Sequence, residues 1–281
     1  MKRFVLIICF LCFIITLFSQ TTIDSLEFQL ESASEKDKTE ILNELAKNNW
    51  DIQPRKSLEF ASQALILSQK YKDKYQEIHS LNNMGTASAI LGDIEKALEY
   101  FQQGLTIANE EDNKEMISGI SNNLANIHFG WGSYRESLKF YILAAKMFSK
   151  LNNEHGLCVS YGNIALIYDY LTEYEKSLEY HKLALKYAEK IDDKREIASC
   201  YLNIAEHHSS LKKFDTAFEF YQKAYDIGKS LNSMMLITGS LNGIASYYKQ
   251  EKKYRLAIEN FLKSLQISVQ RGDITQTAAT Y

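Results

Sequence analysis

The sequence predicts an all-α fold, a superhelical solenoid of antiparallel helix pairs, and three observations lead to this expectation. Segments offset by 40 residues align without gaps, namely Asn83 to Leu105, Asn123 to Ala145, Asn163 to Leu185, Asn203 to Tyr225 and Gly243 to Leu265. Within each segment, apolar and small residues recur at spacings of three and four, which places them on one helical face. A single Pro and 12 Gly in 281 residues fit an almost wholly helical chain. A period of this size indicates stacked repeats.

Three columns of the repeat describe how the helices should pack. Small residues would let two helix backbones approach, and large rings would fill the space beside the next pair. The small columns are Gly85, Ala125, Ala165, Ala205 and Ala245, followed by Gly104, Ala144, Ala184, Ala224 and Ser264, and the ring column is Phe101, Tyr141, His181, Tyr221 and Phe261. Two helices and two short turns in each repeat predict helices of about 17 residues, or ~25 Å at 1.5 Å per residue.

At these columns the chain resembles the tetratricopeptide repeat, whose pattern runs from a large residue through Leu-Gly and Tyr to Ala, Phe and Ala. The matching residues in one copy are Tyr161, Ile164, Ala165, Tyr168, Ser177, His181 and Ala184. The resemblance covers roughly residues 34–281. The family's usual repeat has about 34 residues and a Pro near its end, whereas this repeat is longer and has no Pro there. The additional residues must therefore lengthen the helices.

Residues 1–19 read as a secretory signal peptide. Lys2 and Arg3 form a positive start, an apolar run follows from Phe4 to Phe18, and Ser19 is a small residue suited to cleavage. Leu17 is bulkier than usual for its position before the cut, so an uncleaved N-terminal membrane anchor is the alternative. The run is short against the ~20 residues that span a bilayer. We therefore expect export across the inner membrane, to a periplasmic or extracytoplasmic location.

The elements then follow in order. A lead-in of uncertain order spans residues 20–33, and a degenerate first repeat spans 34–73, with Pro54 suited to the first turn of its second helix. The regular repeats are predicted at 74–113, 114–153, 154–193, 194–233 and 234–273. Small polar residues between repeats should cap the helices that follow: Asp73, Asn113, Asn153, Asp193, Ser233 and Asp273. Residues 274–281 begin a further, incomplete repeat, so either a downstream region or a partner should cover that end.

One column of the expected groove surface is unusual because it holds asparagine, a poor residue for the middle of a helix. It comprises Asn83, Asn123, Asn163 and Asn203, with Asn82 and Asn122 beside it, Asn43 in the degenerate repeat, and Gly243 ending the series. Two interpretations stay open. A carboxamide can both donate to and accept from the backbone of an extended peptide, as the family resemblance implies, or these residues can bond adjacent helices together. Nearby groove positions are Asn126, Phe129, Asp169 and Glu206.

Other classes of function lack support in the sequence. A net charge of −3 offers no basic surface for nucleic acid. No nucleophile–His–acid set, phosphate loop or CxxC motif is apparent, so we predict no catalytic residues, no metal and no cofactor. His207 and His208 are adjacent and cannot face the same way on a helix, so His208 should be a core residue. Cys158 and Cys200 are expected to be buried thiols, with a disulfide as the alternative.

These observations together predict a non-enzymatic scaffold that binds a peptide or protein segment in its groove. Starts resembling Asn-Asn-Leu-Ala and the opening from Leu42 to Ala46 are similar to the sensor arrays of bacterial histidine kinases and transcription regulators. That resemblance implies the exported sensory or interaction region of a signalling protein whose effector part is absent here. The alternative is a self-contained periplasmic assembly scaffold.

Overall fold

The computed structural model describes residues 22–271, and all of the secondary structure in that range is helical. The chain divides into two compact units, residues 1–143 (unit 1) and 144–281 (unit 2), and each is treated by itself. The expected signal peptide, the cap at Asp273 and the incomplete repeat at 274–281 lie outside the described residues. Between residues 22 and 271, no helix is both long and apolar enough to cross a membrane.

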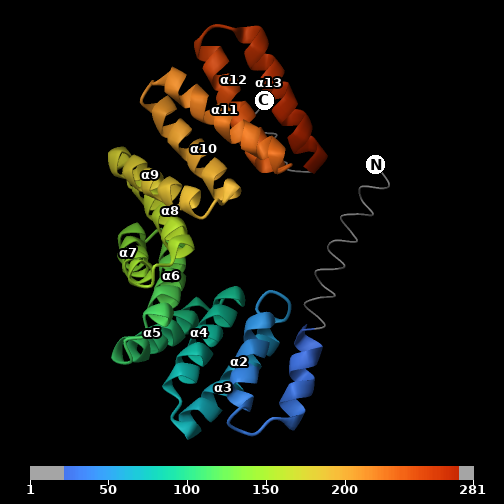
Figure 1. Cartoon of the computed structure of the whole chain (residues 1–281), viewed down its shortest axis with the longest axis vertical. Coiled ribbons are helices and arrows are strands. Elements are labelled where there is room, and N and C mark those ends of the chain that lie inside the picture. The colour runs from blue at the N-terminus through green and yellow to red at the C-terminus, as the bar shows by residue number, and fades with distance from the viewer. Residues whose placement is uncertain (1–21, 272–281) are drawn as a thin grey trace. The chain divides into compact units, whose positions relative to one another are not determined.

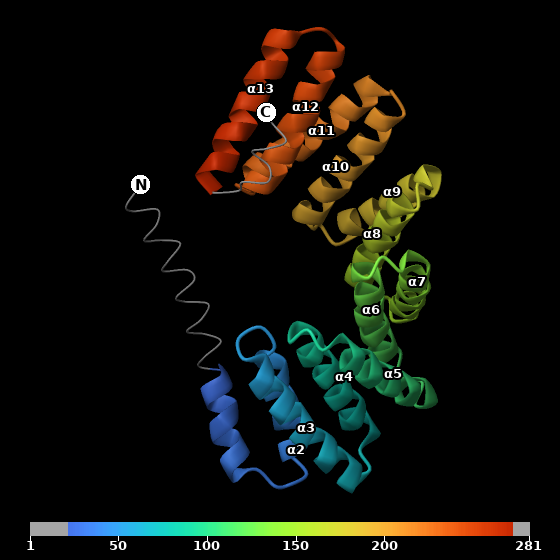
Figure 2. The same cartoon turned by 180° about the vertical axis from the view of Figure 1, so that it is seen from behind.

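Helices follow one another in antiparallel pairs within each unit, as Figures 1 and 2 show from opposite sides. Unit 1 holds a helix at residues 22–32, then α2 (Lys38–Asn48), α3 (Pro54–Tyr71), α4 (Lys74–Ile90), α5 (Ile94–Glu110) and α6 (Lys114–Gly130). Helix α7 (Tyr134–Lys150) spans the boundary. Unit 2 holds α8 (Glu154–Tyr170), α9 (Tyr174–Lys190), α10 (Lys194–Ser210), α11 (Phe214–Ser230), α12 (Met234–Gln250) and α13 (Tyr254–Arg271). The predicted fold class is confirmed.

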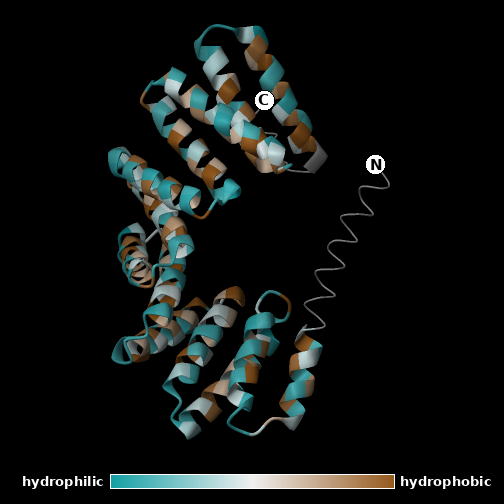
Figure 3. Ribbon diagram, viewed as in Figure 1, coloured by the Kyte–Doolittle hydropathy of each residue, from teal (hydrophilic) through white to brown (hydrophobic). Residues whose placement is uncertain are grey.

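The predicted helix length is also confirmed, because most helices from α4 onward have 17 residues. Each predicted interval from 74–113 to 234–273 contains one helix pair. Every helix carries both hydrophilic and hydrophobic residues along its length (Figure 3). The two helices of a pair therefore bury one side against each other and leave the other to solvent or to the next pair.

The expected packing of small residues against rings occurs where the columns predict it. A Cβ atom added to Gly85 on α4 would lie 2.6 Å from the ring of Phe101 on α5, closer than packed atoms approach. The other small residues of that column, from Ala125 to Ala245, are fully buried. Four of the five rings of the ring column are buried too, with Phe101 1% and His181 2% exposed, whereas Phe261 is half-buried. The repeat period is thus set by side-chain fit between helices.

Gly243, where the asparagine column ends, packs closely against a ring of the preceding helix. A Cβ atom at this position of α12 would lie 2.3 Å from the ring of Tyr221 on α11. The ring occupies the space that an asparagine side chain would need. Burial raises the pKa of the Tyr221 hydroxyl well above its usual value, which agrees with a ring held in the core.

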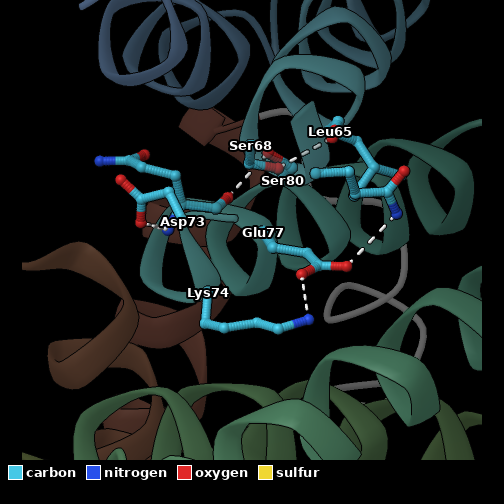
Figure 4. A network of polar contacts seen from close by, with 8 residues as sticks. Leu65, Ser68, Asp73, Lys74, Glu77 and Ser80 are labelled. Atoms are coloured by element: carbon cyan, nitrogen blue, oxygen red, sulfur yellow. Dashed lines mark hydrogen bonds and ion pairs between the residues drawn. The ribbon is translucent and has the colours of Figure 1, made fainter. Parts of the chain in front are cut away.

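Helix starts between repeats are capped as the sequence predicts. Asp73, Asn113, Asn153 and Asp193 each accept a hydrogen bond from a backbone N–H in the first turn of the next helix, at 2.8 to 3.1 Å. Figure 4 shows the first of these junctions, where Lys74 and Glu77 also form an ion pair of 2.7 Å. Ser233 departs from the pattern, because its side chain caps nothing in the described structure.

Helix ends share a left-handed residue in the turn that follows. In unit 1, Gly92 and Gly132 hold this conformation, with φ of 83° and 70°. In unit 2 the corresponding residues are Thr172 and Lys212, with φ of 60° and 59°. The backbone N–H of Thr172 donates to Asp169 O at 2.9 Å, which closes the end of α8. A β-branched residue is strained in this conformation, whereas glycine is not.

The lead-in at residues 20–33 was expected to be of uncertain order, but residues 22–32 form a helix. Ile23 is 4% exposed, and the Glu27 carboxylate lies 2.6 Å from Lys56 Nζ on α3. Burial of this apolar residue against the first repeat gives the segment a reason to fold, and sequence periodicity over so short a stretch was too weak to reveal it.

Candidate functional site

In unit 1 the asparagine column bonds first helices to each other. Asn83, 3% exposed, donates from Nδ2 to the Asn43 carbonyl oxygen at 3.0 Å. Asn43 in turn donates to the side-chain oxygen of Gln76 at 2.8 Å and accepts from Ser80 Oγ at 3.1 Å. Asn123 Nδ2 donates to Asn82 Oδ1 at 3.0 Å, which ties α6 to α4. These carboxamides serve the contact between neighbouring repeats.

In unit 2 the asparagine side chains of the same column do not bond to neighbouring helices. Asn163 on α8 is half-buried and Asn203 on α10 is exposed. Neither side-chain amide forms a hydrogen bond with any part of the chain that the structure describes, and each residue lines a hollow on the surface of α8 and α10. Their donors and acceptors are therefore available to a ligand.

The first hollow, the α8–α10 pocket, has a volume of about 360 Å³. It is lined by Leu166, Asp169, Tyr170, Tyr174, Asn203, Glu206, His207 and Ser210. Three of these residues, Asp169, Asn203 and Glu206, are groove positions expected from the sequence. The pocket combines carboxylates, a carboxamide and an imidazole with the exposed rings of Tyr170 and Tyr174, a lining suited to a polar ligand with some apolar surface.

A second hollow of about 300 Å³ lies beside the first and shares Leu166 and Asn203 with it. Asn163 and His181 also line it, together with the thiols of Cys158 and Cys200. Both cysteines are free and buried, so the expectation of thiols is confirmed and the disulfide alternative is wrong. Burial raises the pKa of Cys158 to about 11 and that of Cys200 to about 12, which leaves both thiols protonated and unreactive near neutral pH.

A cluster of ligand-type side chains lies at the α8–α10 pocket, drawn from three helices. Asp169 of α8 places Oδ1 at 2.9 Å from His207 Nε2 of α10, and Oδ2 at 3.5 Å from His181 Nε2 of α9. Ser177 Oγ lies 2.9 Å from the same Nε2 of His207. We call Asp169, His181 and His207 the Asp–His–His cluster.

Burial and neighbouring charges shift the protonation of these groups. Burial works to raise the pKa of Asp169, but contacts with His181 and Ser177 and the two nearby imidazoles hold it below its usual value. Burial lowers the pKa of His207 and so favours its neutral form. Partial removal of water and the charge of Asp169 raise the pKa of the Glu206 carboxyl. The cluster thus presents an anionic carboxylate and a neutral imidazole at pH 7.

No nucleophile–His–acid set is apparent along the sequence, yet the fold brings Ser177, His207 and Asp169 together. Their arrangement differs from a catalytic triad, because Ser177 and Asp169 contact the same ring nitrogen of His207. A triad needs the acid on one nitrogen and the nucleophile on the other. Ser177 is also fully buried, so its hydroxyl is out of reach of a substrate. The geometry therefore gives no reason to assign hydrolysis to this set.

The remaining expected site residues take varied places. Asn122 is half-buried and its Oδ1 has no hydrogen-bonding partner in the described structure. Asn126 is exposed and accepts a hydrogen bond from the Tyr141 hydroxyl. Phe129 packs its ring against that of Tyr134, with 5.8 Å between the ring centroids. His208, as expected for a core position, stacks on Phe220 with 5.9 Å between the ring centroids.

Sequence reasoning missed two features of the site. His181 was assigned to the ring column alone, and His207 was compared only with its neighbour His208. The signal that would have found the cluster is their coincidence: both histidines replace apolar residues of other repeats, His181 in the repeat that carries Asp169 and His207 in the next one. Tyr170 and Tyr174 were also missed, because they lie near the turn between helices, outside the groove register.

Profiles of the tetratricopeptide repeat match residues 117–190 and 158–230, and others of the same description match 78–111 and 238–268. Together they cover more than half of the chain. No curated protein sequence matches it.

Three solved structures illustrate the similarity of fold. A signal-transduction ATPase with a tetratricopeptide repeat sensor, from Pyrococcus horikoshii, is 18% identical with a TM-score of 0.79, over 94% of this chain and 42% of that one. The quorum sensor NprR from B. thuringiensis is 14% identical with a TM-score of 0.68, and the match covers 92% of this chain and 73% of that one. A Rap protein complexed with competence and sporulation factor is 22% identical with a TM-score of 0.60, and the match covers 93% of this chain and 74% of that one.

Proposed function

The chain belongs to the tetratricopeptide repeat family, and from that premise we propose that it binds a peptide or protein segment at the first-helix surface of unit 2. The observation that carries the proposal concerns the side-chain amides of Asn163 and Asn203. Both residues line hollows, and their amides form no hydrogen bond with the described chain. Polar side chains that a helix must accommodate at a cost, and that stabilise nothing inside the fold, are available for recognition.

The lining of the α8–α10 pocket indicates the chemistry of the ligand. A carboxamide donates and accepts at once, which suits the alternating N–H and C=O groups of an extended backbone. Glu206 adds a carboxylate, and the exposed rings of Tyr170 and Tyr174 offer faces to a cation or to another ring. We therefore propose a segment with an extended backbone and a basic or aromatic side chain.

Two of the structurally similar proteins support this class of function. One is named as a quorum sensor, and another was solved as a complex with competence and sporulation factor. Their identity to this chain is low, so the likeness concerns the fold, and the proposal depends on the residues of unit 2.

A random peptide library displayed on phage, panned over the immobilised chain, tests the proposal. Selected peptides are then titrated by fluorescence anisotropy against the wild type and against Asn163→Ala and Asn203→Ala. Loss of a pair of hydrogen bonds at about 1.4 kcal/mol in total should raise Kd about 10-fold in each variant. Ser246→Ala, at the exposed position of α12 that lies one repeat after Glu206, serves as a matched control that keeps the affinity.

Selection of no peptide above background would contradict the proposal. So would peptides whose Kd is unchanged in both asparagine variants, because the open carboxamides would then play no part. Far-UV circular dichroism of each variant separates loss of binding from loss of fold.

We further propose that the chain is the exported sensory or interaction region of a bacterial signalling protein. The positive start and apolar run of residues 1–19 support export, and the similarity to a tetratricopeptide repeat sensor supports a sensory role. An alkaline phosphatase fusion after residue 271 should be active if the region is exported. The DNA sequence beyond codon 281 should encode an apolar run of ~20 residues followed by an effector.

An inactive fusion would contradict export. A stop codon directly after codon 281, together with an active fusion, would instead favour the self-contained periplasmic assembly scaffold.

A further inference from the structure

The Asp–His–His cluster departs from the repeat at each of its three positions. Where His181 stands, the other regular repeats have Phe101, Tyr141, Tyr221 and Phe261. Where His207 stands, they have Ala87, Ile127, Ile167 and Tyr247, and where Asp169 stands, they have Ala89, Phe129, Ser209 and Lys249. The packing of this fold therefore requires no metal-ligating side chain at any of these places, and here all three meet.

We propose that Asp169, His181 and His207 bind a divalent transition-metal ion of the zinc class. One ligand atom from each residue lies within 4.8 Å of the others. A tetrahedral ion with bonds of ~2.0–2.1 Å holds its ligand atoms ~3.3 Å apart. Asp169 Oδ1 lies 2.9 Å from His207 Nε2, and Asp169 Oδ2 lies 3.5 Å from His181 Nε2. An ion held by one oxygen of Asp169 and both imidazoles would require rotation of these side chains from the positions that they hold here.

His181 supplies an independent reason to expect a ligand. Its side chain is 2% exposed and Nδ1 has no hydrogen-bonding partner in the described structure, while the contact of Nε2 with Asp169 Oδ2 is long, at 3.5 Å, and does not form a hydrogen bond. A buried polar atom without a hydrogen bond costs about 1–3 kcal/mol, and such atoms are uncommon in native proteins. A metal ion at Nε2 would replace this long contact with a bond. Binding would also exchange the contact between Ser177 and His207 for a metal bond.

The ligand set selects the kind of ion. Two imidazoles and one carboxylate suit Zn²⁺, Co²⁺ or Ni²⁺, whereas Mg²⁺ and Ca²⁺ prefer oxygen ligands throughout. Three protein ligands leave a fourth coordination position open. Asp169 and His207 line the α8–α10 pocket, so this position is reached from it, with Glu206 close by. The ion would join α8, α9 and α10, and this inference does not depend on peptide binding.

The test uses the full chain, stripped with a chelator and titrated with Co²⁺ alone and with Zn²⁺ alone. We expect one equivalent of Co²⁺ to give the visible absorption of a tetrahedral site, and Zn²⁺ to displace it. His181→Phe, His207→Ile and Asp169→Ser place the residues of other repeats at the cluster, so they should fold. Each should weaken Zn²⁺ binding at least ~100-fold, because residues that merely support ligands are worth 10–100-fold.

His208→Tyr is the matched control, since it removes an adjacent histidine and introduces the residue found at Tyr168 and Tyr248. Its Zn²⁺ affinity should equal that of the wild type. Asp169→Asn keeps the size of the side chain and should still lose affinity. The inference is overturned if the stripped chain binds no ion. It is equally overturned if His181→Phe and His207→Ile, folded by circular dichroism, bind Zn²⁺ as the wild type does.

Discussion

The two units use the same asparagine column in opposite ways. In unit 1, Asn83 and Asn123 bond to residues of the preceding first helix, at Asn43 and Asn82. In unit 2, the side-chain amides of Asn163 and Asn203 form no hydrogen bond with the described chain, and both residues line hollows. One residue type in one register thus holds repeats together in one region and faces a pocket in the other.

In unit 1 the hydrogen bonds of the column cross from one first helix to the next. Helices α2 and α4, and likewise α4 and α6, pack directly against each other, and Asn83 and Asn123 bond across these two contacts. The side-chain amides of Asn163 and Asn203 have no such partner in the described chain. A repeated polar residue therefore acquires its role from the groups that the neighbouring repeat places within hydrogen-bonding distance. The following predictions test this contrast, from the largest effect to the smallest.

The largest effect should come from extending the column into α12. In Gly243→Asn, the new side chain would overlap the ring of Tyr221, which lies 2.3 Å from the position of the added Cβ. We expect the free energy of unfolding to fall by about 3 kcal/mol, the upper range for overpacking. Urea denaturation measures the change. Gly119→Ala is the control, because no atom lies within 4 Å of its added Cβ, and it should stabilise by up to about 1 kcal/mol.

Removing a buried carboxamide from unit 1 should have the next largest effect. In Asn83→Ala, the carbonyl and side-chain oxygens of Asn43 lose a donor in the core. The free energy of unfolding should fall by about 2 kcal/mol, the cost of leaving buried polar atoms unpaired. Asn203→Ala, measured alongside, should stay within about 0.5 kcal/mol of the wild type, as for an exposed position. Equal losses in the two variants would contradict the comparison.

A double-mutant cycle sharpens the contrast further. Asn43→Ala and Asn83→Ala should show a coupling energy of about 1 kcal/mol, because the two side chains bond to each other. Asn163→Ala and Asn203→Ala should be additive within about 0.3 kcal/mol, since no bond joins them. Coupling of similar size in both cycles would show that the unit 2 asparagines also bond across the stack in solution.

The smallest expected effect is on the reactivity of Cys158 and Cys200, the two thiols that line the second hollow. The pKa of Cys158 is raised to about 11 and that of Cys200 to about 12, and the thiolate is the reactive form. Alkylation of either thiol by iodoacetamide in the native chain should therefore stay slow at pH 8 and quicken only as the pH approaches 11. Mass spectrometry of the two cysteine peptides measures the rates, with the urea-unfolded chain as the reference for full reactivity.

Most of the fold followed from the sequence, because its period and its small and large columns are both local and repeated. Gly85, Phe101 and the caps at Asp73 and Asn113 could be assigned from spacing alone. The site was less accessible. The different roles of Asn83 and Asn203 depend on which groups of the neighbouring helix lie within hydrogen-bonding distance, and no pattern along one chain encodes this. The Asp–His–His cluster joins residues 12 to 38 positions apart on three helices, so it appears only when the repeats are folded.

Thr172, whose left-handed backbone closes α8, has a further consequence for this region. A β-branched side chain at φ 60° costs roughly 1–2 kcal/mol relative to glycine, and glycines hold the matching turns after α4 and α6. The hairpin between Asp169 and His181 therefore carries backbone strain that the glycine turns of unit 1 lack, while Lys212 holds the same left-handed conformation in the turn after α10. A ligand or ion bound to both α8 and α9 would hold this strained hairpin closed, and its release should favour local opening there.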